Sequence, residues 1–94
     1  MDMGDLDGVW SVQRTGGALP PLVGVVKDIE GGRGWTKVGP LPGAPFDVDG
    51  LALRYRGPLA AFVDVLERDG DVYRGHATFM GRQYGTFVMR RKER

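Results

Sequence analysis

Hydrophobic residues alternate with polar ones along most of this chain, and glycine or proline ends each run after about eight to twelve residues. The first half predicts strands over 8–14, 23–29 and 35–38, and no segment keeps a helical period for ten residues or so. The pattern predicts an all-β fold, a small antiparallel meander of about seven or eight strands forming a closed or partly open barrel. We expect residues 1–94 to form this single domain.

Turn residues fix the register in the second half. Asp49-Gly50, Gly57-Pro58 and Asp69-Gly70 each separate two alternating runs. Two-residue loops at the last two turns pair Leu53 with Phe62 and give one consistent inward face. That face contains Leu51, Leu53, Tyr55, Ala60, Phe62, Asp64, Leu66, Tyr73, Gly75, Ala77 and Phe79.

The last turn, at Met80-Gly81-Arg82, allows two registers. A three-residue loop with a glycine bulge turns Phe87, Met89 and Arg91 inward. A two-residue loop turns the alternate set inward, namely Tyr84, Thr86 and Val88. We favour the first because Phe87 and Met89 are the larger apolar pair.

Asp64 is the main candidate site residue, because the register buries its carboxylate between Phe62 and Leu66. Such a carboxylate can anchor a polar ligand group or transfer a proton. Tyr55 and Tyr73 on the same face would present an apolar ring with a polar tip to a ligand. The small residues Ala60, Gly75 and Ala77 leave space that could form the pocket.

A solid core is the competing interpretation of this face. Asp64 would then be structural, bonded to Tyr55, Tyr73 or a backbone amide. The aromatic residues would fill the interior, namely Trp10, Phe46, Phe62, Phe79 and Phe87.

The two ends of the chain resemble the lipocalins and fatty-acid-binding proteins, the calycins. Gly8-Val9-Trp10 follows the Gly-x-Trp of their first strand, and Phe87-Val88-Met89 precedes Arg90 and Arg91. The resemblance implies an up-and-down barrel that binds a small hydrophobic molecule inside. It also implies that Arg90 or Arg91 packs across Trp10.

Composition narrows the other classes of function. The net charge is +1, from 13 basic and 12 acidic residues that are mixed along the chain, so nucleic acid is not the expected partner. There is no cysteine, and His76, the only histidine, is expected to face outward, so we expect no metal site and no cofactor. Residues 1–5 are acidic without an apolar run, which predicts a cytoplasmic protein with no membrane association.

The segment Leu59–Leu66 is apolar at its outward positions as well. Either the stems of Arg54 and Arg56 screen these positions, or a homodimer interface covers them. We therefore expect a small hydrophobic or aromatic ligand bound by Asp64, Tyr55, Tyr73, Phe62, Trp10 and Arg91. The alternatives are a solid-cored interaction or homodimer module, and an isomerase or cyclase that uses Asp64 for proton transfer.

Overall fold

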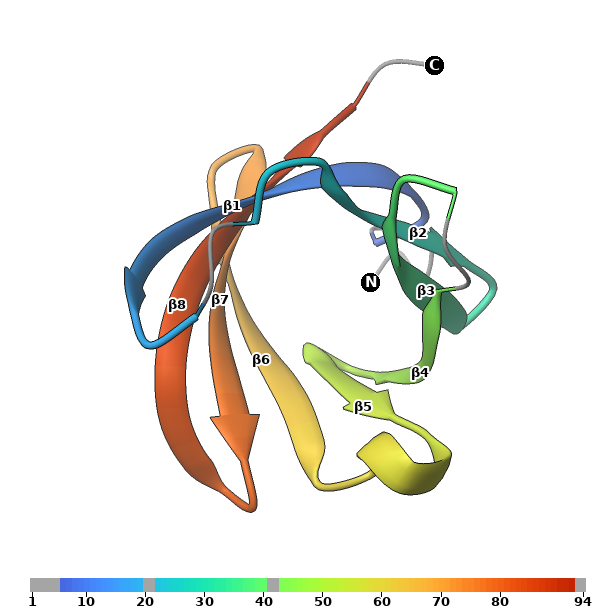
Figure 1. Ribbon diagram of the computed structural model, residues 1–94. Helices are drawn as coiled ribbons and strands as arrows, with labels where there is room; N and C mark the ends of the chain where they lie inside the picture. Colours follow the sequence, from blue (N-terminus) through green and yellow to red (C-terminus); the bar gives the residue numbers. More distant parts are fainter. Residues whose placement is uncertain (1–5, 20–21, 41–42, 93–94) are drawn as a thin grey trace.

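The chain folds into a closed barrel of eight antiparallel strands (Figure 1). The computed structural model describes residues 6–19, 22–40 and 43–92. Each strand pairs with the next, and β8 pairs with β1 to close the ring. This confirms the predicted fold class. The strands are β1 (Gly8–Gly17), β2 (Val25–Glu30), β3 (Arg33–Val38), β4 (Ala44–Asp49), β5 (Ala52–Tyr55), β6 (Phe62–Asp69), β7 (Val72–Phe79) and β8 (Arg82–Arg91).

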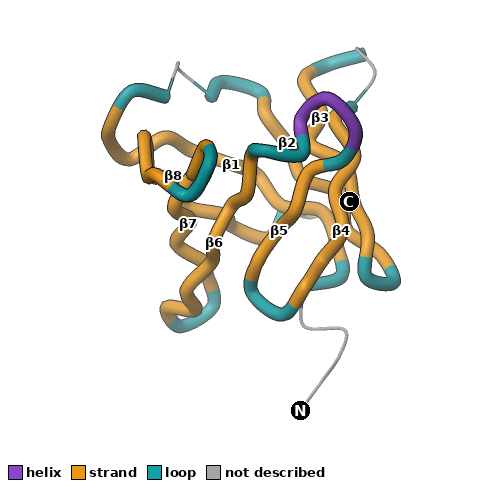
Figure 2. Tube along the Cα trace, turned by 90° about the horizontal axis from the view of Figure 1, so that it is seen from below, coloured by secondary structure: helices purple, strands orange, loops and turns teal. Residues whose placement is uncertain are grey.

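The predicted pairing of β5 with β6 is wrong in register but right in face. A 3₁₀ turn, η1 (Gly57–Leu59), replaces the expected two-residue loop, so Leu53 lies opposite Asp64 instead of Phe62. Figure 2 shows this turn at the end of the barrel opposite the β4–β5 turn. The segment predicted as a strand over Leu59–Leu66 therefore begins at Phe62.

The β6–β7 hairpin shows the same kind of shift. Its turn is Gly70-Asp71, which places Leu66 opposite Gly75 instead of Tyr73. Both shifts move the partner by two positions, and an even shift leaves every side chain on its original face. The inward positions predicted for the middle of these strands are therefore confirmed. The prediction is wrong for three residues near the turns, which are exposed: Leu51, Ala60 and Phe79.

The β7–β8 hairpin combines both of the registers considered for it. The loop is two residues, Met80-Gly81, both with positive φ, so the favoured three-residue loop is wrong. Beyond the Thr78–Gln83 pair, a bulge in β8 shifts the register of the hairpin. The extra residue restores the favoured inward set, and Phe87 and Met89 are buried as expected.

Phe87 fills the space beside Gly75, where the sequence suggested a gap. The two residues are cross-strand partners, and a Cβ on Gly75 would lie 2.1 Å from Cζ of the Phe87 ring. The glycine therefore accommodates the ring instead of leaving a void. Ala60 lies outside the strands, so of the three small residues only Ala77 borders a cavity.

Half of the interior, here called the packed half, is filled with apolar side chains. Its largest members are less than 2% exposed, namely Trp10, Ile29, Phe46, Leu53 and Met89. The Trp10 indole nitrogen donates to the Leu6 carbonyl at 2.9 Å, and the Tyr73 ring meets Trp10 edge-on at 5.4 Å. The Arg91 guanidinium lies 4.4 Å from the centre of the Trp10 ring, as the resemblance implied for Arg90 or Arg91.

Candidate functional site

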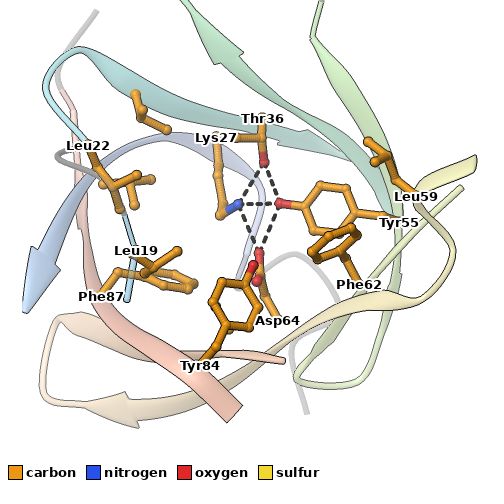
Figure 3. A pocket seen from close by; sticks show the side chains of 13 residues that line it. Leu19, Leu22, Lys27, Thr36, Tyr55, Leu59, Phe62, Asp64, Tyr84 and Phe87 are labelled. Carbon is orange, nitrogen blue, oxygen red and sulfur yellow. Dashed lines mark hydrogen bonds and ion pairs between the residues drawn. The ribbon is translucent and has the colours of Figure 1, made fainter. Parts of the chain in front are cut away.

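Four polar side chains from four strands meet inside the other half of the barrel (Figure 3). Lys27 of β2, Thr36 of β3, Tyr55 of β5 and Asp64 of β6 all occupy inward positions of their strands. Lys27 Nζ lies 2.6 Å from Thr36 Oγ1, 2.8 Å from the Tyr55 hydroxyl and 3.1 Å from Asp64 Oδ2. These four residues are called the polar cluster below.

The hydrogen bonds of the polar cluster form a single consistent arrangement. The Lys27 ammonium has three N–H groups and three acceptors within reach. The Tyr55 hydroxyl donates to Asp64 Oδ2 at 2.9 Å. The contact of 2.7 Å between Thr36 Oγ1 and the Tyr55 oxygen must then use the Thr36 proton.

Burial shifts the pKa of two members of this cluster, Lys27 and Tyr55. The Lys27 side chain is 3% exposed and that of Asp64 is 9% exposed. Burial lowers the pKa of Lys27, and the neighbouring Asp64 carboxylate opposes this effect. Burial also raises the pKa of Tyr55 far above its ordinary value, and the Asp64 charge adds to that effect.

Aromatic rings surround the Lys27 ammonium. Its nitrogen lies 5.4 Å from the ring centres of Phe46 and Tyr55 and 5.5 Å from that of Phe87. A cation at this distance is attracted by the ring faces, particularly where water is excluded. Because Phe46 belongs to the packed half, its contact with Lys27 places the Lys27–Asp64 ion pair directly against that half of the interior.

A cavity of about 240 Å³ lies above the polar cluster. The cluster forms its polar floor, and side chains around it form an apolar wall (Figure 3). Leu19 and Leu22 come from the β1–β2 connection. The two prolines within 18–22 predict a loop or at most one helical turn there, and these prolines, Pro20 and Pro21, lie outside the described residues. The wall consists of Val12, Leu19, Leu22, Val25, Leu59, Phe62, Ala77, Tyr84 and Phe87.

The structure separates the predicted ligand-binding residues into two groups. Asp64, Tyr55 and Phe62 line the cavity together. Tyr73, Trp10 and Arg91 belong to the packed half and border a different depression, beside the β6–β7 turn. Of the two tyrosines considered as partners of Asp64, only Tyr55 bonds to it.

Sequence reasoning missed Lys27 and Thr36, and placed Tyr84 inward only in the register that was not favoured. Lys27 could have been found, because it lies between Val25 and Ile29 at inward spacing and so places a charge in the barrel. Nothing in the sequence distinguishes Thr36. Tyr84 lines the cavity because the two-residue loop, the register that we did not favour, turns it inward before the bulge.

Within the part of the chain that the structure describes, no three His, Cys, Asp or Glu side chains gather as metal ligands would. His76 is half-buried, and its Nδ1 lies 3.1 Å from Gln83 Oε1 on the neighbouring strand. None of the described helices has the length and apolar character needed to cross a membrane. The chain matches no family model, no curated protein and no solved structure, so the calycin resemblance has no support from comparison.

Proposed function

We propose that this barrel binds a small hydrophobic or aromatic molecule in the cavity above the polar cluster. The observation that carries the proposal is the combination of an apolar wall with a buried polar floor. Ligand sites typically have this composition, in which apolar contacts supply affinity and a few fixed polar groups orient the ligand. A calycin-like mode of binding, inside the barrel and between its walls, is part of the same proposal.

The cavity volume limits the size of the ligand. A cavity of about 150 Å³ in a protein core holds one benzene molecule. The volume of about 240 Å³ therefore suits one aromatic ring with a few substituent atoms. The proposed ligand is therefore a compact molecule.

Thermal unfolding of the purified protein against a panel of compact aromatic and aliphatic compounds tests the proposal. A ligand at a hundred times its Kd adds about 2.7 kcal/mol to the free energy of unfolding. For a domain of this size the midpoint then rises by roughly 10 to 20 °C.

A pair of variants shows whether such a rise comes from the cavity. Ala77 lines the cavity and Ala61 is exposed outside it. Ala77→Leu should fill the cavity and remove the rise, whereas Ala61→Leu should retain it. An equal rise in both variants, each with a native circular dichroism spectrum, would place the ligand elsewhere, and a flat panel would support a solid-cored module.

A further inference from the structure

The polar cluster uses its tyrosine and threonine protons internally. Tyr55 donates to Asp64 and Thr36 donates to Tyr55, while Lys27 Nζ lies within reach of all three oxygens. A ligand that accepts a hydrogen bond from Tyr55 or Thr36 would have to break this network. It would thereby leave a buried donor or acceptor without its partner, which is costly.

An acceptor does remain available, at Asp64 Oδ1. The Tyr55 hydrogen bond and the Lys27 ion pair both end on Oδ2, and no group among residues 6–19, 22–40 and 43–92 donates to Oδ1. No fully buried side-chain oxygen of the described residues lacks a partner, so Oδ1 is not fully buried, and Asp64 lines the cavity. A ligand N–H or O–H can reach this oxygen without disturbing the cluster.

The Tyr84 hydroxyl is a second polar group of the cavity with which a ligand can form a hydrogen bond. Its hydroxyl makes no hydrogen bond with any described residue, and Figure 3 shows its side chain next to Asp64. Burial and the Asp64 charge raise the pKa of Tyr84, so this hydroxyl stays protonated at neutral pH. It can therefore donate to a ligand oxygen that itself donates to Asp64.

The charge of the floor also limits the ligand. Lys27 and Asp64 neutralise each other at 3.1 Å, so a charged ligand would bring an uncompensated charge into an apolar cavity. An anion would meet the free oxygen of Asp64, and a cation would lie near the Lys27 ammonium. The floor therefore suits a neutral ligand.

We infer that the ligand of this barrel is an uncharged compact molecule, phenol-like or indole-like, whose O–H or N–H donates to Asp64 Oδ1. The inference rests on the proposed function, since it concerns the same cavity. It names the chemistry of the ligand, an uncharged hydrogen-bond donor, and disfavours carboxylates.

Four matched probes separate these possibilities: para-cresol, para-methylanisole, para-toluate and para-methylbenzylamine. Isothermal titration of the wild-type protein at neutral pH should give para-cresol the lowest Kd. Its affinity should exceed that of para-methylanisole, which cannot donate, by about tenfold, with both charged probes weaker still. An equal or tighter Kd for the ether, the carboxylate or the amine would overturn the inference while leaving the proposed binding intact. Failure of all four probes to bind would remove both.

Two tyrosine variants locate the polar contact. Tyr84→Phe removes a hydroxyl that has no partner in the described protein, so the fold should be retained and para-cresol binding should weaken about fivefold. Tyr73→Phe makes the same change in the packed half and should leave the Kd unchanged. Equal Kd values for para-cresol in both variants would contradict the assigned role of Tyr84.

Discussion

A basic side chain lies against aromatic rings in each half of the barrel, but the two arrangements are opposite. In the packed half, Arg91 covers the Trp10 ring from the rim and donates to the Asp7 carbonyl at 2.8 Å. Among the described residues, the only buried charged side chains are Lys27 and Asp64 of the polar cluster. In the other half, Lys27 points inside, pairs with Asp64 and lies beneath a cavity. The first arrangement stabilises a closed core, whereas the second places polar groups where a ligand can reach them.

This difference indicates that the packed half contributes most to the stability of the fold. Apolar packing is the cheaper way to fill a barrel, because a buried ion pair loses more hydration energy than an apolar replacement of similar volume. The packed half follows this rule throughout, with Phe46, Leu53 and Met89 fully enclosed. The polar cluster departs from it, and the departure is understandable if the cluster serves binding.

The largest expected effect is the loss of stability when a large side chain of the packed half is truncated. Trp10→Ala should lower the free energy of unfolding by about 4 kcal/mol, because it leaves a cavity in a close-packed core. Trp35→Ala is the matched control, since Trp35 is 40% exposed, and should cost less than about 1 kcal/mol. Urea unfolding measures both. Similar losses in the two variants would mean that the Trp10 half is not the stabilising one.

Breaking the buried ion pair should have the next largest effect. Lys27→Met leaves the Asp64 carboxylate without its cation and should cost about 3 kcal/mol in urea unfolding. The double variant Lys27→Met/Asp64→Leu should recover most of this loss, since it replaces the pair with apolar groups. It should also abolish the preference for para-cresol over para-methylanisole.

Lys37 is the control for this experiment. It pairs with Asp28 at 3.5 Å, and the two side chains are 44% and 38% exposed. Lys37→Met should change the free energy of unfolding by no more than about 0.5 kcal/mol. A double variant as unstable as Lys27→Met alone would show that the cluster stabilises the fold in a way that apolar packing cannot replace.

The smallest expected effect is a dependence of stability on alkaline pH. The folded-state pKa of Tyr55 is raised above its ordinary value of 10.0, so its contribution to stability is complete below that pH. As the pH rises above 10.0, the unfolded chain loses the Tyr55 proton while the folded protein keeps it, and this contribution falls. The loss amounts to about 1.4 kcal/mol per pH unit.

Comparison with Tyr55→Phe isolates this contribution. The wild type should be more stable than the variant at neutral pH by about 1 to 2 kcal/mol, because the variant loses the Tyr55 hydrogen bonds. Urea unfolding at a series of pH values should show this advantage shrinking in alkaline solution. Parallel pH profiles for the two proteins would contradict the burial of a protonated Tyr55 hydroxyl.

The sequence predicted the fold class and the main candidate residue because both depend on local alternation. A period of two places Asp64 inward in both the predicted and the observed register of its hairpins. The shift of two positions between these registers changed the cross-strand partner of Asp64 but not the face on which it lies. The turn lengths were predicted less well. The 3₁₀ turn at Gly57–Leu59 and the bulge in β8 add residues that no alternating pattern reveals.

The sequence alone therefore determined a small antiparallel barrel of about seven or eight strands, an inward carboxylate at Asp64 and apolar residues around it. Only the tertiary structure determined that Lys27, from a strand 37 positions earlier, meets that carboxylate at 3.1 Å. It also showed that Phe87 fills the space at Gly75 while a cavity stays open near Ala77. The physical reason is that face follows from local periodicity, whereas distances across a barrel depend on the register and stagger of all eight strands together.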